Sequence, residues 1–299
     1  MRCNTTRVAR KALFVGAMCL ATGFGLVSAS HGAEQAQPKA RMNRLIEALE
    51  SGKTAMSGDT WMFADFEHQT YSIDRLQQTM TALFAKKNEK GQPALAPIVR
   101  VPTEGDQNVR WVIKQALETG ALGIIVPQTD TKEDALKIVQ SMRYPQRVNT
   151  KYPAPVGRRG SGGPSRTWGY TSMTDEYLQK ADLWPLNPAG ELIVLPMLES
   201  PEGVKNINEL LDVPGVTGVL IGPNDLSQNY GQGPWYPTTH TPVVEQAIET
   251  VAKACVAKKK YCGMVTATPD ETQKYLKLGF KVIFATYLKG STPPADLLK

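Results

Sequence analysis

Long basic surfaces and nucleotide-binding glycine motifs are missing from this sequence of 299 residues. No stretch interleaves lysine and arginine with aromatic side chains, which argues against nucleic-acid binding. The one dense basic run, residues 258–260, ends a predicted helix, where the helix dipole favours positive charge. No Gly-x-Gly-x-x-Gly sequence follows the first predicted strand, so a doubly wound dinucleotide-binding sheet is the weaker of two α/β interpretations.

Acidic residues are absent from the first 29 positions. An apolar run from Ala12 to Val27 follows four cations: Arg2, Arg7, Arg10 and Lys11. The run contains glycines and falls short of the roughly 18 strongly apolar residues of a membrane span, so a cleaved signal is favoured over an anchor. Without those cations the formal net charge falls from +6 to +2. We expect a signal peptide (1–29), a linker (30–41) and one domain (42–299) in an exported, periplasmic or secreted protein with no stable membrane anchor after signal cleavage.

Cysteine is scarce, and only Cys255 and Cys262 lie beyond the predicted signal. A disulfide between them is one alternative in an exported protein. Cys255 looks helical, however, and Cys262 begins a predicted strand, so two buried thiols are at least as well supported. We therefore predict two free thiols in the mature protein.

Short β-branched runs alternate with helical periodicities along most of the chain, which is typical of a parallel α/β fold. The predicted strands are 60–65, 96–101, 122–126, 192–198, 216–222, 261–266 and 281–286, with a weaker candidate at 53–57. The predicted helices are 73–86, 108–119, 132–142, 201–211, 242–257 and 269–278. Seven or eight such units in about 250 residues predict a (β/α)8 barrel.

A long connection, residues 144–190, contains the glycine-rich stretch 157–164 with Arg158 and Arg159. It is either a mobile substrate lid or a plain surface loop. We favour the lid, because connections of this length in compact domains usually have a function.

Two carboxylates follow successive predicted strands. Glu199 closes the apolar run 192–198, and Asp225 follows the run 216–221 after a Gly-Pro turn. Parallel neighbouring strands end at the same edge of a sheet, so the two carboxylates should converge. Such oxygen ligands suit Mg²⁺ or Mn²⁺. The alternative is that each merely caps the helix after its strand.

Other reactive side chains occupy strand ends. His68 lies beside Asp65 and Glu67, and Arg100 ends the next strand. His68 is interpreted as a base rather than a structural histidine. Arg100 is either a buried ion-pair partner or a two-point grip on a carboxylate or enolate. The only lysine placed for a Schiff base is Lys289, beyond the last strand, so a metal-dependent route fits better.

These motifs resemble the HpcH/HpaI aldolase/citrate lyase family, and within it the 4-hydroxy-2-oxoacid aldolase branch. The matching blocks are 61–68, 97–102, 117–127, 143–145, 196–199 and 213–227. The resemblance runs in order from about residue 42 to residue 286, and the last block is its most specific part. It implies a (β/α)8 barrel, usually a hexamer, that uses a divalent metal (Mg²⁺, Mn²⁺ or Co²⁺). The implied reaction cleaves a 4-hydroxy-2-oxo acid reversibly to pyruvate, or a close relative, and an aldehyde.

The resemblance also implies roles for individual residues. Glu199 and Asp225 become the metal ligands, His68 the base acting through water, and Arg100 the clamp on the pyruvoyl group. Backbone N–H groups that follow the Gly-Pro turn would hold the substrate carboxylate, at a site made of Gly222, Pro223, Asn224 and Asp225.

Further implied roles concern other parts of the chain. Arg159 with Gly160 matches the Arg-Gly pair of the family's substrate loop, although Arg158 is an equally good register. Glu118 aligns with the carboxylate that partners the base from a neighbouring subunit, and Asp65 and Glu67 support the site. We accordingly expect a homo-oligomer, a trimer or a hexamer.

Departures from the family pattern keep two rivals open. The first βα unit is shortened or missing, and Met197 replaces a common glutamine. The family usually has Asp where this chain has Glu118. One rival is a CoA-ester lyase of the citrate lyase type. The other is an exported 2-oxoacid-binding protein without turnover.

Overall fold

The computed structural model describes residues 41–233 and 241–293. The predicted signal peptide and nearly all of the predicted linker lie outside these residues. The described residues all belong to one compact unit. Within the described ranges, no helix is both long and apolar enough to cross a bilayer.

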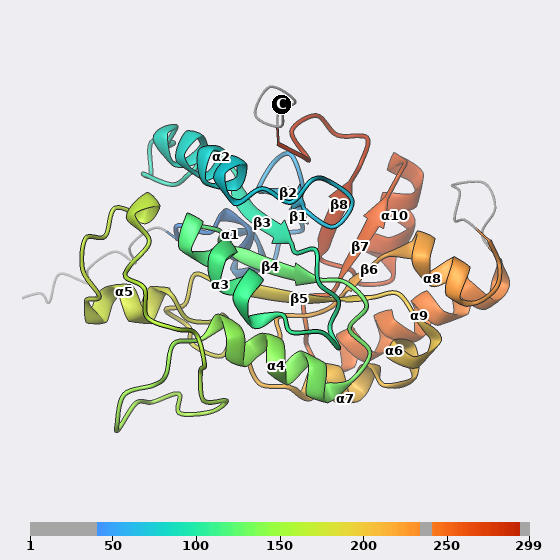
Figure 1. Ribbon diagram of the computed structural model, residues 1–299. Coiled ribbons are helices and arrows are strands. Elements are labelled where there is room, and N and C mark those ends of the chain that lie inside the picture. The colour runs from blue at the N-terminus through green and yellow to red at the C-terminus, as the bar shows by residue number, and fades with distance from the viewer. Residues whose placement is uncertain (1–40, 234–240, 294–299) are drawn as a thin grey trace, which may run out of the picture. The chain divides into compact units, whose positions relative to one another are not determined.

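Eight parallel strands form a nearly closed (β/α)8 barrel, in the order β1-β8-β7-β6-β5-β4-β3-β2. Its strands are almost continuously apolar, because helices cover one side of the sheet and packed side chains fill the other. This confirms the predicted fold (Figure 1). The strands are β1 (Ala55–Met56), β2 (Trp61–Asp65), β3 (Ala96–Arg100), β4 (Gly123–Val126), β5 (Ile193–Leu198), β6 (Leu220–Ile221), β7 (Gly263–Thr266) and β8 (Val282–Ala285).

Helices alternate with the strands. They are α1 (Arg44–Glu50), α2 (Ile73–Ala85), α3 (Arg110–Thr119), α4 (Lys132–Met142), α5 (Asp175–Lys180), α6 (Pro201–Lys205), α7 (Ile207–Asp212), α8 (Pro223–Asn229), α9 (Pro242–Ala257) and α10 (Pro269–Lys277), with a 3-10 turn η1 (Arg166–Trp168). The sequence did not predict α1, α5 or α8. The predicted helix 201–211 is divided at Asn206, and the predicted strand 216–222 is reduced to β6.

Hydroxyl side chains begin several of the helices that follow strands. Ser72, Thr131, Ser200 and Thr268 accept hydrogen bonds from backbone N–H groups in the first turns of α2, α4, α6 and α10. A cap of this kind satisfies a donor that has no partner inside the helix. The caps fix where each helix starts, and therefore where the loops that follow the strands end.

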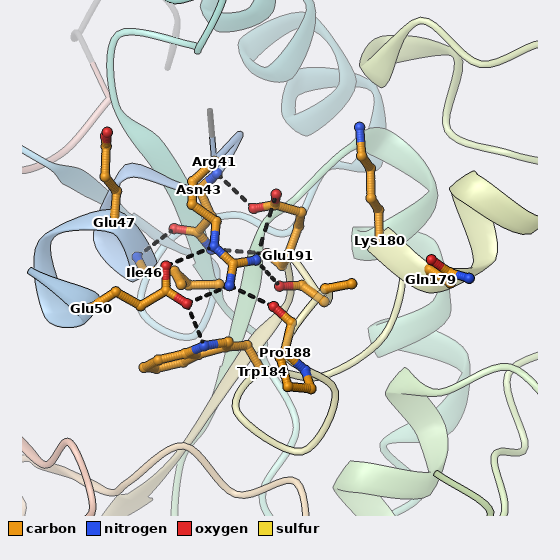
Figure 2. A network of polar contacts seen from close by, with 12 residues as sticks. Arg41, Asn43, Ile46, Glu47, Glu50, Gln179, Lys180, Trp184, Pro188 and Glu191 are labelled. Atoms are coloured by element: carbon orange, nitrogen blue, oxygen red, sulfur yellow. Dashed lines mark hydrogen bonds and ion pairs between the residues drawn. The ribbon is translucent and has the colours of Figure 1, made fainter. Parts of the chain in front are cut away.

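A polar network fixes α1 at the amino ends of β4 and β5 (Figure 2). Asn43 is fully buried, caps α1, and donates from its side chain to the carbonyls of Leu122 (3.0 Å) and Glu191 (2.9 Å). The Arg41 guanidinium donates to Glu50 (2.9 Å) and to the Gly190 carbonyl (3.0 Å). Because Leu122 and Glu191 lie at the starts of these strands, α1 covers the amino end of the barrel. This is the end opposite the carboxyl ends of the strands.

The first βα unit is shortened, as the sequence predicted. Only residues 57–60 join β1 to β2, with no helix between them. Among the described residues, the two strands meet at a single bridge between Ser57 and Trp61. β1 instead pairs with β8, at Ala55 and Met56.

The expectation of two free thiols is wrong in this structure. Cys255 in the last turn of α9 and Cys262 before β7 form a disulfide, with Cα atoms 6.0 Å apart. The sequence argument placed Cys255 in a helix and Cys262 beside a strand correctly, but it wrongly inferred that this separation keeps the two thiols apart. The turn at residues 258–260 brings the end of the helix back beside the strand that follows it, where Lys260 N donates to the Cys255 carbonyl.

Removing this disulfide should destabilise the fold measurably. A link across seven residues of sequence separation stabilises by about 2 to 3 kcal/mol in the chain-entropy model. We expect Cys255→Ser/Cys262→Ser to lower the free energy of unfolding by that amount in a denaturant titration. Peptide mapping without reductant should recover one linked peptide pair containing both cysteines. Recovery of both peptides with free thiols would contradict the bond.

Candidate active site

A cavity of about 300 Å³ lies where the strands end. Its lining comes from β2, β3, β5, β7 and β8 and from the loops and helices that follow the strands, including the turn after β6. The lining residues are Phe63, His68, Arg100, Met197, Glu199, Gly222, Pro223, Asn224, Asp225, Val265, Ala267, Glu271 and Phe284. The structure therefore brings together His68, Arg100, Glu199 and the 222–225 turn, as the strand-end argument predicted.

Glu199 is the most deeply buried acid of the cavity, at 1% exposure. Its Oε2 accepts a hydrogen bond from the Gln128 backbone N–H at 3.0 Å, and its Oε1 has no donor among the described residues. A Cβ at Gly222 would lie 2.3 Å from Oε1, so only glycine fits against this carboxylate. Burial raises the pKa of Glu199 to about 8, and the charges of Glu67 and Asp225 add to the rise.

Asp225 belongs to the first turn of α8, which begins at Pro223 directly after Gly222. Its Oδ1 accepts only a long hydrogen bond, 3.5 Å from Gln228 Nε2. Asn229, one turn further on, donates to the Glu199 carbonyl at 2.8 Å and ties α8 to the end of β5. The turn thus holds a second carboxylate at the cavity that contains Glu199.

The Arg100 guanidinium is held by two acids of the β2 end. Nε and Nη2 donate to the two carboxylate oxygens of Asp65 at 2.9 and 2.8 Å, and Nη1 lies 2.7 Å from Glu67 Oε2. Burial opposes ionisation of Asp65, but the hydrogen bonds from Arg100 prevail and lower its pKa. Nη1 also lies 3.7 Å from the sulfur of Met197. The Nε–Nη2 edge of the guanidinium is therefore bonded to Asp65. Nη1 lies beside the cavity residue Met197.

His68 follows the same strand end and faces the opening. Its side chain is 60% exposed, and Nε2 lies 3.6 Å from Glu67 Oε2. Burial raises the pKa of Glu67, against the opposing effect of Arg100. Asp65, Glu67, His68 and Arg100 thus form one connected group of charges.

The donor set fits a divalent cation that takes part of its ligands from water or substrate. In the described ranges no three His, Cys, Asp or Glu side chains are grouped as a ready metal cage. Glu199 nevertheless keeps one buried carboxylate oxygen without a donor, beside a second acid. An unsatisfied buried acceptor is costly, and a hard cation bound by carboxylates would satisfy it.

Arg159 and Glu118 do not line this cavity. Helices that follow strands run back towards the amino end of the barrel. Glu118 lies in the last turn of α3, and the Arg159 backbone is bonded to the carbonyl of Arg143 after α4. Arg159 is 2% exposed and lies over the Tyr144 ring at 4.4 Å.

No residue of the 144–190 connection lines the cavity, and its contacts lie elsewhere in the chain. Arg143 is fully buried and anchors the connection by donating to the Asp182 carboxylate and to the carbonyls of Tyr152 and Pro155. A Cβ at Gly162 would lie 2.8 Å from Glu118 Oε1, so the glycine-rich stretch packs on α3. The connection starts after α4, which runs back to the amino ends of the strands. It therefore begins at the end of the barrel opposite the cavity.

Several cavity residues were not recognised from the sequence. Phe63, Val265 and Phe284 are apolar residues of β2, β7 and β8 that line the cavity. Glu271 caps its own loop by accepting from the Ala267 N–H at 2.7 Å. Applying the strand-end rule to β7 and β8 as well would have found Val265 and Phe284.

Comparison with known proteins now adds to the geometry. The family model for HpcH/HpaI aldolase/citrate lyase matches residues 45–287. The chain belongs to this family. Among curated relatives, the 2-keto-3-deoxy-L-rhamnonate aldolase of Escherichia coli (strain K12) is 31% identical over 226 residues, which cover 75% of this chain and 73% of the relative. The HpcH/HpaI family and its members indicate a carbon–carbon lyase of the aldolase type.

Solved structures agree on the fold. An HpcH/HpaI aldolase/citrate lyase family protein from Burkholderia cenocepacia J2315 has a TM-score of 0.61 at 26% identity, and the match covers 75% of this chain and 77% of that one. An HpcH/HpaI aldolase from Desulfitobacterium hafniense DCB-2 has a TM-score of 0.65 at 22% identity, covering 82% and 90%. The second likeness concerns the fold alone.

The buried Glu199 should make the metal-free protein less stable as pH rises. Its pKa is about 8 in the fold and 4.5 as an ordinary glutamate, so the native state binds the proton more tightly. This contribution is fully present below pH 4.5 and is lost as pH rises towards about 8, by up to about 1.4 kcal/mol per pH unit. Denaturant titrations in chelator should show this fall, and Glu199→Gln should flatten it. An equal slope in both proteins would contradict the assignment.

Proposed function

We propose that this protein is a metal-dependent aldolase that acts on a carbon–carbon bond of a 4-hydroxy-2-oxo acid. Cleavage of this bond gives pyruvate and an aldehyde, and the reverse reaction joins them. Family membership supports the reaction class. The printed name of the E. coli relative describes an aldolase for a 2-keto-3-deoxy sugar acid, which is consistent with a 2-oxo acid substrate.

The observation that carries the proposal is the unsatisfied oxygen of Glu199 in the cavity that also contains Asp225 and Arg100. Glu199 and Asp225 would hold Mg²⁺, Mn²⁺ or Co²⁺. When bound, such a metal polarises the 2-oxo group and stabilises the enolate that remains after bond cleavage. Backbone N–H groups of Asn224 and Asp225, in the first turn of α8, would bind the substrate carboxylate.

The remaining residues orient the substrate and move its proton. Arg100, fixed by Asp65 and Glu67, directs Nη1 towards the 2-oxo oxygen, where negative charge develops. His68 at the opening removes the proton of the 4-hydroxyl group through a water molecule in the cleavage direction. Met197 has no hydrogen-bond donor to offer a substrate, and its sulfur accepts from Arg100 Nη1 at 3.7 Å, so substrate orientation depends on Arg100 rather than on a neutral side-chain amide at this position.

We further propose that the protein is a homo-oligomer, a trimer or a hexamer, whose subunits complete one another's sites. Two observations support this. Arg159 and Glu118 lie away from the strand-end cavity of their own chain. Both keep buried polar atoms without hydrogen-bond partners among the described residues, namely Arg159 Nε and Nη2 and Glu118 Oε1. A second copy would give these groups partners and place Glu118 near the base.

An exported location remains our proposal for where the protein works. The apolar stretch after four cations at the start of the chain motivates it. The disulfide between Cys255 and Cys262 supports it, because such bonds persist mainly in oxidising compartments.

Chelation should abolish turnover. We expect no release of pyruvate from a panel of 4-hydroxy-2-oxo acids in excess EDTA, and recovery on adding Mg²⁺, Mn²⁺ or Co²⁺, measured in a coupled pyruvate assay. Asp225→Ala should lose both Mn²⁺ binding and activity by removing one of two anionic ligands. Asp270→Ala is the matched control, because Asp270 is an exposed acid in the first turn of α10, as Asp225 lies in the first turn of α8, and it should retain both.

The outcomes separate the alternatives. Full activity in EDTA after dialysis would contradict the metal role. Binding of Mn²⁺ and pyruvate without turnover on any substrate would instead favour the binding protein that lacks catalysis.

Replacing Arg100 with lysine should be more damaging than its conserved charge suggests. A lysine cannot contact both oxygens of Asp65 and still reach Glu67 and the substrate. We expect kcat/KM to fall on the order of 10² or more, as when a main electrostatic stabiliser is removed. Arg110→Lys on the exposed start of α3 is the control. Near wild-type kinetics for Arg100→Lys would make Arg100 purely structural.

A further inference from the structure

The seam between β1 and β2 leaves part of β2 without a neighbouring strand. β1 contains only Ala55 and Met56, and both pair with β8. Phe63 lies in the middle of β2 and is 2% exposed. Its backbone N–H faces the seam and needs a partner inside the protein, because buried backbone donors are almost always paired.

That partner comes from the far end of the chain. The carbonyl of Ser291 accepts from the Phe63 N–H at 2.8 Å. A Cβ at Gly58 would lie 2.7 Å from the Lys289 carbonyl, so the chain after β8 packs directly on the β1–β2 link. In Figure 1 this part of the chain, coloured red, leaves β8 beside β1 and β2. We call residues 286–293 the seam segment.

Side-chain hydroxyls close the seam in a ring of hydrogen bonds. The Ala285 N–H donates to Ser57 Oγ (2.9 Å), which donates to Ser291 Oγ (2.8 Å), which donates to the Ala285 carbonyl (2.7 Å). Ser57 is fully buried and Ser291 is 2% exposed. The ring joins the end of β1, the end of β8 and the seam segment, and each hydroxyl uses both its donor and an acceptor.

The seam forms one wall of the cavity. Phe63 of β2 and Phe284 of β8 stack across it, with ring centroids 4.2 Å apart and planes 11° from parallel, and both line the cavity. The Arg100 guanidinium lies 5.2 Å from the centroid of Phe63. No residue of β1 lines the cavity, so the aromatic pair occupies the side next to the shortened strand.

We propose that the seam segment replaces the missing end of the first strand, and that Ser291 is a positioning residue that fixes the Phe63–Phe284 wall. The wall limits the apolar bulk of the 2-oxo acid that the cavity admits. The positioning role of Ser291 does not depend on the proposed function. The limit on substrate size rests on the proposed function.

Hydrogen exchange of the full-length protein tests the positioning role without any assay of activity. Ser291→Ala should raise exchange in the peptide containing β2 by about tenfold, the loss expected when one buried hydrogen-bond ring opens. The peptide containing β4 is the internal reference and should not change. Ser57→Ala should act in the same way, and the double variant should add little, because both hydroxyls belong to one ring. The exposed Ser172→Ala is the control.

Binding of two probes tests the limit on size. With Mn²⁺ present, calorimetry measures the affinity for phenylpyruvate divided by the affinity for pyruvate. The proteins are the wild type, the serine variants named above and Phe284→Ala. Removing the ring should raise the ratio by about tenfold or more, since pocket volume is what rejects the larger group. Ser291→Ala should also raise the phenylpyruvate-to-pyruvate affinity ratio. A general loss of protein stability would leave this affinity ratio unchanged.

Each result has a defined meaning. Unchanged exchange at β2 in both serine variants overturns the positioning role. An unchanged ratio in Phe284→Ala overturns the limit on substrate size, even if exchange has changed. Altered exchange and an altered ratio without turnover would leave this inference standing while the proposed aldolase reaction fails.

Discussion

Closing the barrel is the constraint on which the rest of the structure depends. A sheet has unpaired edges until its first and last strands meet, and here the first strand has two residues. The chain meets this constraint at both ends. Asn43 and Arg41 fix α1 at the amino ends of the strands, and Ser57 and Ser291 join β1, β8 and the seam segment near the carboxyl ends. Without closure, the strand ends would not surround one cavity.

Within that cavity, charge balance decides which groups are available for chemistry. Arg100 is neutralised by Asp65 and Glu67, so its position is fixed before any ligand binds. Glu199 forms no ion pair with any residue that the structure describes, and burial raises its pKa to about 8. A paired arginine next to an unpaired buried glutamate is an arrangement that favours an incoming cation, which lowers the cost of ionising the acid.

The comparison of sequence and structure follows the range of the interactions involved. Alternating β-branched runs and helical periods predicted the barrel, because burial on both sides of a parallel strand leaves a local signature. The convergence of His68, Arg100, Glu199 and Asp225 on one cavity was also predictable, since parallel strands end at one edge. The sequence did not reveal the Cys255–Cys262 disulfide, because it depends on how a helix turns back beside a strand.

The sequence by itself determined the family, the barrel and the acids and bases at the strand ends, because each is written in contiguous residues. Only the tertiary structure decided where Arg159, Glu118 and the 144–190 connection lie, since no local sequence pattern says at which end of the barrel a loop packs. The same holds for the Phe63–Phe284 wall and its support by Ser291. Phe63 is more than 200 positions away from both Phe284 and Ser291, and contacts across such a sequence separation arise only when the whole barrel has folded.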